Sequence, residues 1–316
     1  MPEVRGIGAS GLAAPPLMLG GNVFGWTADR AASFEVLDAF VAGGGTLIDT
    51  ADVYSAWAPG NAGGESETII GEWLKARGHR DHVLIATKVG MMDGPGGKGL
   101  HPARIAAAVD ESLRRLGTDY IDLYFAHRDD EAVPQADVMG AFDALVQAGK
   151  VRAIGASNYS TDRLASALAA SDANGLARFT VLQPEYNLVR RTQFEGALQD
   201  LCVAEGIGAV PYYSLASGFL TGKYRQADDA GKSTRGEGAS RYLDDRGRRV
   251  LAALDAVAAE QDIALATVSL AWLAARPGVV APIASARTIA QLPELLYSMS
   301  IRLTPDQIAR LDAASA

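Results

Sequence analysis

Three polar side chains, each near the C-terminal end of an apolar run, could form an acid–base centre with a nearby tyrosine. Asp49 lies in TLIDTAD (46–52), Lys88 in VLIATKV (83–89) and His127 in IDLYFAH (121–127), and Tyr54 follows Asp49 by five residues. A tyrosine hydroxyl has a pKa of about 10, which a neighbouring ammonium group lowers by favouring the phenolate. We therefore expect Lys88 to tune Tyr54, Asp49 to keep Lys88 charged, and His127 to orient a carbonyl oxygen.

Each of these four residues also has an ordinary structural role open to it. A strand-end lysine often extends to the surface, an aspartate before Thr-Ala often caps a turn, and a lone histidine or tyrosine often only packs. Their occurrence together, at the same end of successive units, favours the chemical role. No nucleophile with an adjacent base accompanies them, which argues against acyl transfer.

Eight apolar runs that alternate with amphipathic stretches must position these side chains. Strands alternating with helices predict right-handed βαβ units and a parallel sheet. An open doubly wound sheet and a closed (β/α)8 barrel both fit this order, and eight units in one chain favour the barrel. The remaining runs are 16–22, 151–157, 179–185, 208–214 and 279–285.

Side-chain alternation predicts where the polar groups point. Asp49 shares a strand face with Leu47, Lys88 with Leu84 and Ala86, and His127 with Leu123 and Phe125. If these faces point into the barrel, the polar groups converge on the mouth formed by the C-terminal strand ends, where barrel enzymes place their catalytic residues.

We predict a single domain, 1–316. The stretches between the apolar runs indicate where its helices and loops begin and end. In 101–117 the apolar residues recur at helical spacing, and Gly117 is placed to end that helix. Thr304-Pro305 is a start signal for a last helix. The polar stretch 217–245 interrupts the alternation after the seventh strand, so we expect a long loop there, as a lid or a disordered segment.

The stretch RGIGASG (5–11) has the spacing G-x-G-x-x-G of a dinucleotide-binding fingerprint. That fingerprint works only between a strand and a helix. Here few residues precede Gly6, and LAAPP follows Gly11 with two prolines that disfavour a helix. We expect a small N-terminal hairpin or turn that closes one end of the barrel.

Composition excludes several classes of protein. A net charge of −8 argues against nucleic-acid binding, and one cysteine among 316 residues fits a reducing cytoplasm. The absence of an apolar signal-peptide core and of a long apolar run predicts a cytoplasmic protein that does not enter a membrane. His79 and His82 precede the third strand at the end opposite the predicted mouth, and His101 opens a helix. No histidine–carboxylate set has ligand spacing at the mouth, so we expect no metal.

Six blocks resemble, in order, those of the aldo-keto reductase superfamily: LIDTADVYS, VLIATKVG, DLYFAHRDD, IGASNYS, LQPEYN and PYYSLASGFLTGKY. The resemblance extends from GGNVFGW (20–26) to IASARTIAQL (283–292). The form with GFLTGKY and a long following loop resembles the bacterial and potassium-channel-beta branches more than the mammalian aldose reductases. It implies a (β/α)8 barrel with NAD(P)H across its C-terminal mouth. Tyr54 would be the proton donor, tuned by Lys88 and Asp49, with His127 positioning the substrate carbonyl.

The resemblance also implies a cofactor site. Ser157, Asn158 and Gln183 would hold the carboxamide, and Tyr212 would stack on the nicotinamide. The residues expected along the pyrophosphate are Leu215, Ser217, Gly218 and Lys223.

The residues expected at the adenosine end of the cofactor lie next to a helix N-terminus that suits a phosphate. They are Ser285, Arg287, Gln291 and Glu294. The guanidinium of Arg287 suits a 2′-phosphate, which favours NADPH over NADH. The chain departs from the family pattern in having Ala284 where proline is common and Leu295 where asparagine is common.

Three aromatic residues, Phe24, Trp26 and Trp57, are candidates for an apolar wall around a small carbonyl substrate. Packing beneath loops is an open alternative for each. The leading function is NADPH-dependent reduction of an aldehyde or ketone. The alternatives are an NAD(P)-dependent dehydrogenase of a sugar or alcohol, a cofactor-sensing binding protein with little turnover, and a metal-dependent barrel hydrolase. Oligomeric state is left open.

Overall fold

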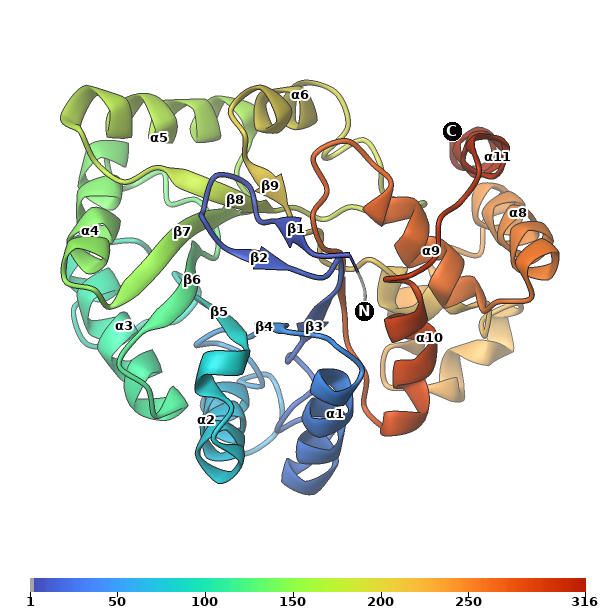
Figure 1. The fold of residues 1–316 in the computed structure, drawn as a ribbon, viewed down its shortest axis with the longest axis horizontal. Helices are drawn as coiled ribbons and strands as arrows, with labels where there is room; N and C mark the ends of the chain where they lie inside the picture. The colour runs from blue at the N-terminus through green and yellow to red at the C-terminus, as the bar shows by residue number, and fades with distance from the viewer. Residues whose placement is uncertain (1–2) are drawn as a thin grey trace.

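A parallel sheet of eight strands forms the centre of the molecule in the computed structural model, which describes residues 3–316 (Figure 1). The predicted domain 1–316 thus includes two residues outside the described range. The strands follow one another around the sheet in chain order, with β10 beside β3. They are β3 (Met18–Gly20), β4 (Leu47–Asp49), β5 (Leu84–Val89), β6 (Ile121–Ala126), β7 (Val151–Ser157), β8 (Phe179–Gln183), β9 (Gly208–Ala209) and β10 (Ile283–Ala284).

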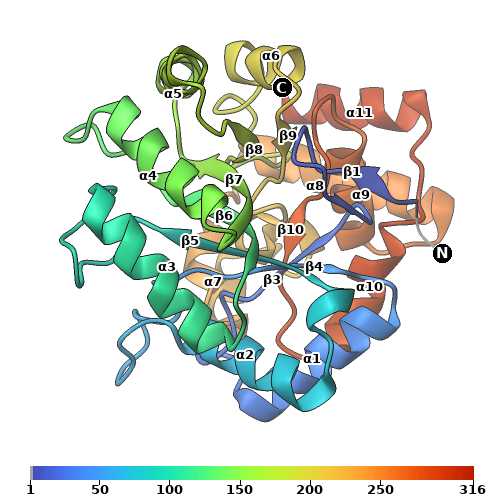
Figure 2. The ribbon, with the colours of Figure 1, turned by 60° about the vertical axis from the view of Figure 1, so that its left-hand side comes forward.

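Helices surround the strands on the outside (Figures 1 and 2). The predicted helix at 101–117 is α3, which Gly117 ends in a left-handed conformation, and the last helix begins with Thr304 as its N-cap. The helices are α1 (Arg30–Ala42), α2 (Glu65–Arg77), α3 (Pro102–Leu116), α4 (Gln135–Gln147), α5 (Thr161–Asn174), α6 (Ala197–Ala204), α7 (Gly236–Ser240), α8 (Asp245–Gln261), α9 (Leu265–Ala274), α10 (Leu292–Tyr297) and α11 (Pro305–Ser315).

Backbone hydrogen bonds close the sheet into a barrel between the segments of β9 and β10, its seventh and eighth strands. The amide of Val280 donates to the carbonyl of Ala209 at 2.8 Å, and the amide of Ile283 donates to Pro211 at 2.9 Å. The predicted (β/α)8 barrel is therefore confirmed. The seventh and eighth strands are shorter than the predicted runs because Pro211 and Pro282 have no N–H to donate to a ladder.

Two separate apolar clusters fill the inside and the outside of the barrel. Leu47, Ala86, Leu123 and Phe125 belong to the inner cluster. The predicted inward faces of β4, β5 and β6 are therefore confirmed. Because side chains alternate along a strand, Asp49 and Lys88 also face inward, toward the C-terminal ends of their strands.

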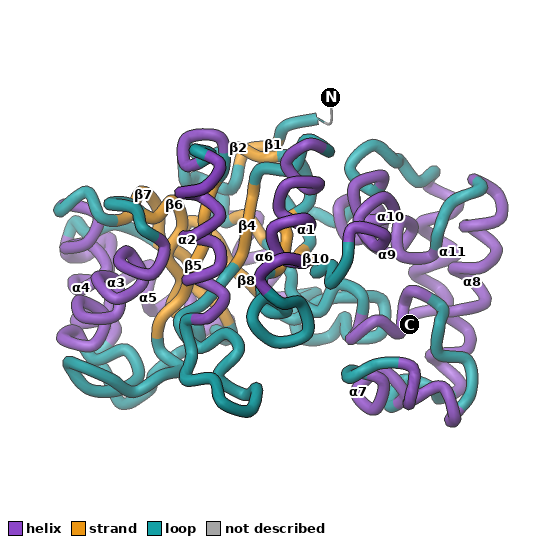
Figure 3. Tube along the Cα trace, turned by 90° about the horizontal axis from the view of Figure 1, so that it is seen from below, coloured by secondary structure: helices purple, strands orange, loops and turns teal. Residues whose placement is uncertain are grey.

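A two-stranded hairpin, β1 (Arg5–Gly6) and β2 (Ala13–Ala14), covers the other end of the barrel, as predicted from its glycines. Ile7 and Leu12 join the inner cluster. A Cβ atom on Gly8 would lie 2.2 Å from the carbonyl oxygen of Thr180, so only glycine fits at this contact. Figure 3 shows the hairpin at the opposite end of the barrel from α7. The glycine spacing therefore serves packing rather than dinucleotide binding.

The predicted long loop at 217–245 contains short helices rather than irregular chain alone. These are 3-10 helices at Ala216–Thr221 and Ala227–Lys232, followed by α7. Tyr224 and Ala239 are fully buried, so apolar side chains fix the segment against the barrel.

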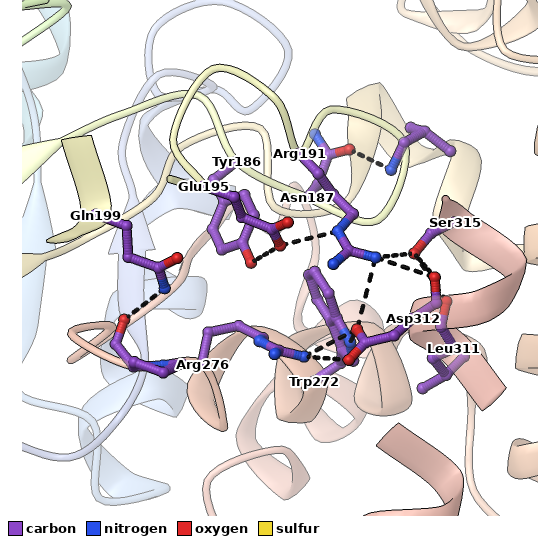
Figure 4. A network of polar contacts seen from close by, with 12 residues as sticks. Tyr186, Asn187, Arg191, Glu195, Gln199, Trp272, Arg276, Leu311, Asp312 and Ser315 are labelled. Carbon is purple, nitrogen blue, oxygen red and sulfur yellow. Dashed lines mark hydrogen bonds and ion pairs between the residues drawn. The ribbon is translucent and has the colours of Figure 1, made fainter. Parts of the chain in front are cut away.

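A polar network joins the segment after β8 to α9 and α11 (Figure 4). Arg191 donates to the carboxylate of Glu195 at 2.8 Å and to the hydroxyl of Ser315 at 2.8 Å. Asp312 accepts from the indole of Trp272 and from Arg276, both at 2.9 Å. These bonds attach the C-terminal helix to the barrel.

Two glycine substitutions test the role of the hairpin. Gly8→Ala should lower the free energy of unfolding by about 2–4 kcal/mol, because the new methyl group meets backbone atoms and the residue has φ +55°. Gly11→Ala should cost only about 1 kcal/mol, since its φ is +73° but nothing lies within 4 Å. Denaturant unfolding of both variants would compare the two costs, and equal losses would contradict the packing role of Gly8.

Candidate active site

A buried ion pair forms the centre of the candidate site at the C-terminal mouth. The ammonium of Lys88 lies 2.7 Å from the carboxylate of Asp49, and the two side chains are 0% and 2% exposed. Lys88 also donates to the carbonyl of Thr50 at 2.7 Å and to the hydroxyl of Tyr54 at 2.8 Å. All three N–H groups of the ammonium are thereby used. The structure thus brings together three of the four residues expected to do acid–base chemistry.

The hydroxyl of Tyr54 is bound between the two charges. It accepts from Lys88 and donates to the second carboxylate oxygen of Asp49 at 2.9 Å. Burial and Asp49 raise the pKa of Tyr54 well above its usual value, whereas the sequence predicted that Lys88 would lower it. The prediction was wrong in direction because it omitted burial and the hydrogen bond to Asp49, which favour the neutral phenol. Burial also lowers the pKa of Lys88, an effect that Asp49 opposes.

His127 lies beside this centre and lines the same cavity. Its ring centroid is 6.0 Å from that of Tyr54. Burial and the positive charges of Lys88 and Arg128 hold the pKa of His127 well below its usual value, so the imidazole is neutral at pH 7. A neutral imidazole carries one N–H, which can donate to a carbonyl oxygen while the other nitrogen stays unprotonated.

The turn after Tyr54 depends on Ser55, which the sequence analysis missed. Ser55 is fully buried with φ +74°, and its hydroxyl donates to the carbonyl of Phe24 at 2.7 Å. This places Phe24 in the core beneath the loop, at 0% exposure, and not among the residues that line the cavity. Phe24 therefore anchors the loop of Tyr54, which corrects its expected place in a substrate wall.

A cavity of about 720 Å³ opens above the ion pair. It runs from Tyr54, Trp57 and His127 to the segment before α10. All the residues expected to hold a cofactor line it: Ser157, Asn158, Gln183, Tyr212, Leu215, Ser217, Gly218, Lys223, Ser285, Arg287, Gln291 and Glu294. One elongated cavity thus joins the candidate acid–base residues to both expected ends of a dinucleotide.

Hydrogen bonds fix the polar residues at the floor of this cavity. The amide of Gln183 donates to Asp49 at 2.9 Å, and the hydroxyl of Ser157 donates to the carbonyl of Gln183 at 2.9 Å. Asn158 has φ +57°, donates to the carbonyl of His127 at 2.9 Å and accepts from the hydroxyl of Tyr212 at 2.7 Å. The floor is therefore already ordered around the ion pair.

Three cations line the cavity: Lys223, Arg235 and Arg287. Among residues 3–316, none of the three forms an ion pair with an acidic side chain. A Cβ atom on Gly218 would lie 3.2 Å from the ammonium of Lys223. A side chain at position 218 would therefore crowd that ammonium, and glycine avoids this. Free positive charge along an elongated cavity fits an anionic ligand.

Arg235 was not predicted from the sequence. It lies between the second 3-10 helix and α7, directly before α7, and its guanidinium lies 5.4 Å from the ring centroid of Trp26. The only sequence signal was its place in the predicted lid, since nothing in the spacing shows that this loop returns over the mouth.

At the far end Leu295 and Ala284 line the cavity with apolar groups, at the two positions that depart from the family pattern.

Apolar side chains surround the opening near Tyr54. Trp57 lines the cavity at 48% exposure and packs edge-on against Trp26 at 5.7 Å between ring centroids. Met91 and Tyr213 line the same opening and are similarly exposed. Trp26 lies behind Trp57 rather than on the cavity lining. Of the three aromatic residues expected in a substrate wall, the structure places Trp57 on the cavity and Trp26 behind it.

The chain belongs to the aldo/keto reductase family, whose sequence profile matches residues 16–316. It is 31% identical to a norsolorinic acid reductase of Aspergillus flavus, over 97% of this chain and 79% of the relative. It is 33% identical to an uncharacterized oxidoreductase, YrpG, of Bacillus subtilis, over 98% and 95%. It is 32% identical to an NADP(+) aryl-alcohol dehydrogenase of Phanerodontia chrysosporium, over 96% and 83%. The chain is thus an oxidoreductase of a family that acts on carbonyl compounds.

Two kinds of feature are absent from the described residues. Across 3–316, no three His, Cys, Asp or Glu side chains are grouped as metal ligands would be. Within the same range no helix is both long and apolar enough to span a bilayer.

Substitution of Ser55 tests how the turn holds Tyr54. Ser55→Ala should lower the free energy of unfolding by about 1–2 kcal/mol, because it loses the bond to Phe24. Like the wild type, this variant still has a Cβ atom at φ +74°. Ser55→Gly loses the same bond but relieves the backbone, so it should be the more stable of the two variants by about 1 kcal/mol. Urea unfolding of both would measure the difference, and a glycine variant less stable than the alanine variant would contradict the proposed strain.

Proposed function

We propose that this protein reduces an aldehyde or ketone to an alcohol with NADPH, and that Tyr54 donates the proton. The observation that carries the proposal is the placement of the Tyr54 hydroxyl between Asp49 and Lys88, on the wall of an open cavity. A phenol whose pKa lies well above 10 keeps its proton at neutral pH, as a general acid requires.

The cavity has the chemistry that a dinucleotide needs. Ser157, Asn158 and Gln183 offer amide and hydroxyl groups at its inner end, and Tyr212 offers a ring beside them. Lys223 and Arg235 would face the pyrophosphate, where their charges have no acidic partner among the described side chains. When bound there, NADPH would supply the hydride for the carbonyl carbon.

The outer end supports a preference for NADPH over NADH. Arg287 lines the cavity next to Gln291, whose side chain accepts from the backbone amide of Arg287 at 2.8 Å. That bond fixes the start of the segment leading into α10. A guanidinium held at this place provides a planar pair of donors that suits the 2′-phosphate.

The chain's own residues would manage the charge that develops during reduction. Neutral His127 would donate a hydrogen bond to the carbonyl oxygen and orient it. Tyr54 would pass its proton to that oxygen as negative charge accumulates there. The ammonium of Lys88, 2.8 Å from the hydroxyl, would stabilise the phenolate that remains.

Two other functions use the same residues. A dehydrogenase working in the opposite direction would need Tyr54 as a base, and the raised pKa of Tyr54 favours reduction at neutral pH instead. A cofactor-sensing binding protein would need no turnover, so activity separates it from both enzymes.

The exposed apolar rim of Trp57, Met91 and Tyr213 supports a substrate with an aromatic or other apolar body.

Turnover is the decisive test. The consumption of NADPH by the purified protein would be followed against aromatic aldehydes, ketones, short aliphatic aldehydes and sugars, with Tyr54→Phe in parallel. We expect the variant to lose at least about 100-fold in kcat, the typical contribution of a general acid, and to keep its affinity for NADPH. Tyr120→Phe is the matched control, because Tyr120 directly precedes β6 and does not line the cavity. A Tyr54→Phe variant with unchanged kcat would refute the assigned acid, and tight NADPH binding without turnover would favour the binding protein.

Cofactor preference rests on Arg287. Arg287→Ala should weaken NADPH binding by about 10- to 100-fold, as expected for the loss of a charge-assisted contact. The affinity for NADH should change by less than about twofold, because NADH has no 2′-phosphate. Arg248→Ala removes an exposed arginine of α8 and controls for the change in net charge. Fluorescence titration with both cofactors would measure this, and an equal loss for both would show that Arg287 does not contact the 2′-phosphate.

A further inference from the structure

The backbone of Tyr213 is left-handed, with φ +52°, although tyrosine is a bulky residue. Residues with a large side chain rarely take this conformation, because the Cβ atom crowds the backbone carbonyl. Strain of this kind gathers at functional sites. Among residues 3–316, the other non-glycine residues with positive φ are Ser55, Asn158, Ala216, Ser217 and Asp262. All of them except Asp262, which ends α8, lie in the loops around the mouth.

Hydrogen bonds to the main chain hold Tyr213 in this conformation. Its carbonyl accepts from the side-chain amide of Asn187 at 2.9 Å and from the backbone amide of Ala216 at 2.7 Å. Asn187 is fully buried. The next residue, Ser214, is buried as well, and its hydroxyl donates to the carbonyl of Pro211 at 2.9 Å. The surrounding structure therefore enforces the backbone without using the tyrosine ring.

Packing within the chain gives little reason for a tyrosine at this position. Tyr213 is 44% exposed, and its ring lies 5.2 Å from that of Tyr212 between centroids, tilted by 57°. Glycine would take the same backbone conformation without the steric cost, and the bonds to the main-chain carbonyl would remain. The chain thus holds an aromatic ring in a strained position and leaves much of it uncovered.

The uncovered ring belongs to the candidate active site. Tyr213 lines the cavity above the ion pair together with Tyr54 and His127. Its neighbour Tyr212 donates to the side-chain oxygen of Asn158 at 2.7 Å, and Asn158 donates to the carbonyl of His127 at 2.9 Å. The position of Tyr213 is thereby tied to the ordered floor of the cavity.

Trp57 gives the same cavity a second exposed aromatic ring. It is 48% exposed and packs edge-on against Tyr54 and Trp26, at 6.0 Å and 5.7 Å between ring centroids. Trp57 follows β4 and Tyr213 follows β9, and these strands are not neighbours in the sheet. Exposed aromatic surface from two separate parts of the barrel therefore borders the cavity.

We propose that Tyr213 is a specificity-determining residue, whose left-handed backbone presents its ring to the body of an aromatic carbonyl substrate. The proposal rests on the function proposed above and adds one residue and one substrate class to it. A flat aromatic ring can stack on the phenol or meet it edge-on, whereas a short aliphatic carbonyl compound has no ring for this contact. Binding of substrate is thus the reason that the strain is kept.

The preference between two ketones tests the proposal, with NADPH as the reductant. Acetophenone carries an aromatic ring and butanone does not. In Tyr213→Gly the ratio of kcat/KM for acetophenone to that for butanone should fall about 5- to 10-fold, the loss of one aromatic contact. The fall should lie mainly in KM, because the ring contacts substrate and transition state alike. Tyr213→Phe keeps the ring and should keep most of the preference.

Tyr297→Ala is the matched control. Tyr297 is 52% exposed at the end of α10 and does not line the cavity. Its removal should leave the ratio unchanged. A ratio that falls equally in this control, or that does not fall in Tyr213→Gly, would overturn the proposal.

Thermal unfolding tests the strain and needs no substrate. Tyr213→Ala keeps a Cβ atom at φ +52° and loses the ring, whereas Tyr213→Gly loses both. We expect the Tm of the glycine variant to lie about 2–4 °C above that of the alanine variant. A glycine variant with a Tm more than about 3 °C below that of the wild type would show that the ring supports the fold, and would also overturn the proposal.

Calorimetric titration with acetophenone separates this proposal from the proposed function. It is done in the presence of NADP+, which has no hydride to give. Acetophenone should bind Tyr213→Gly about 5- to 10-fold more weakly than it binds the wild type. If this difference is found but the wild type reduces neither ketone, the proposed reduction fails and the contact with Tyr213 is still supported. Equal affinities, or no binding to the wild type, would overturn the role of Tyr213.

Discussion

The buried ion pair between Lys88 and Asp49 is the constraint on which the rest of the site depends. Each charge has left water, which costs several kcal/mol unless other bonds replace hydration. Here the replacement is complete: Lys88 uses three donors, and Asp49 accepts from Lys88, Gln183 and Tyr54. Loss of any of these partners would leave a buried charge uncompensated. The pair is therefore stable only in an accurately formed barrel.

The chain distances show why a closed barrel is needed. Gln183 and Asp49 are 134 residues apart in sequence, and their strands, β8 and β4, are not neighbours in the sheet. Their side chains meet because both face the interior at the C-terminal end. In an open sheet the two strands would not face each other, and Asp49 would lose the hydrogen bond that the amide of Gln183 donates. The hydrogen bond that closes the barrel between Ala209 and Val280 thus helps to bring Gln183 within reach of Asp49.

Much of this arrangement could be predicted from the sequence, because polar residues near the ends of apolar strands are rare and side-chain alternation is strict. Asp49, Lys88 and the cavity residues follow from those two rules together with the family resemblance. Other features could not be predicted. Ser55 takes a left-handed conformation that its type does not indicate, Phe24 contributes a backbone carbonyl where a side-chain contact was expected, and Arg235 reaches the mouth only through the path of a loop. The pKa of Tyr54 was predicted in the wrong direction because burial depth is a property of the fold.

The net charge of −8 and the cations of the cavity show that the charge at a site can differ in sign from the total charge of the chain. An acidic protein should repel an anionic cofactor at long range, yet screening at physiological salt limits that repulsion to about 8 Å. Inside the cavity, Lys223, Arg235 and Arg287 act over shorter distances and with less water between the charges. The acidic side chains meanwhile pair with cations on the outer surface, as in Arg77–Asp38 and Arg310–Glu260. The sign of the charge that a ligand meets is therefore decided by which side chains remain unpaired around the cavity, and the total charge of the chain says little about it.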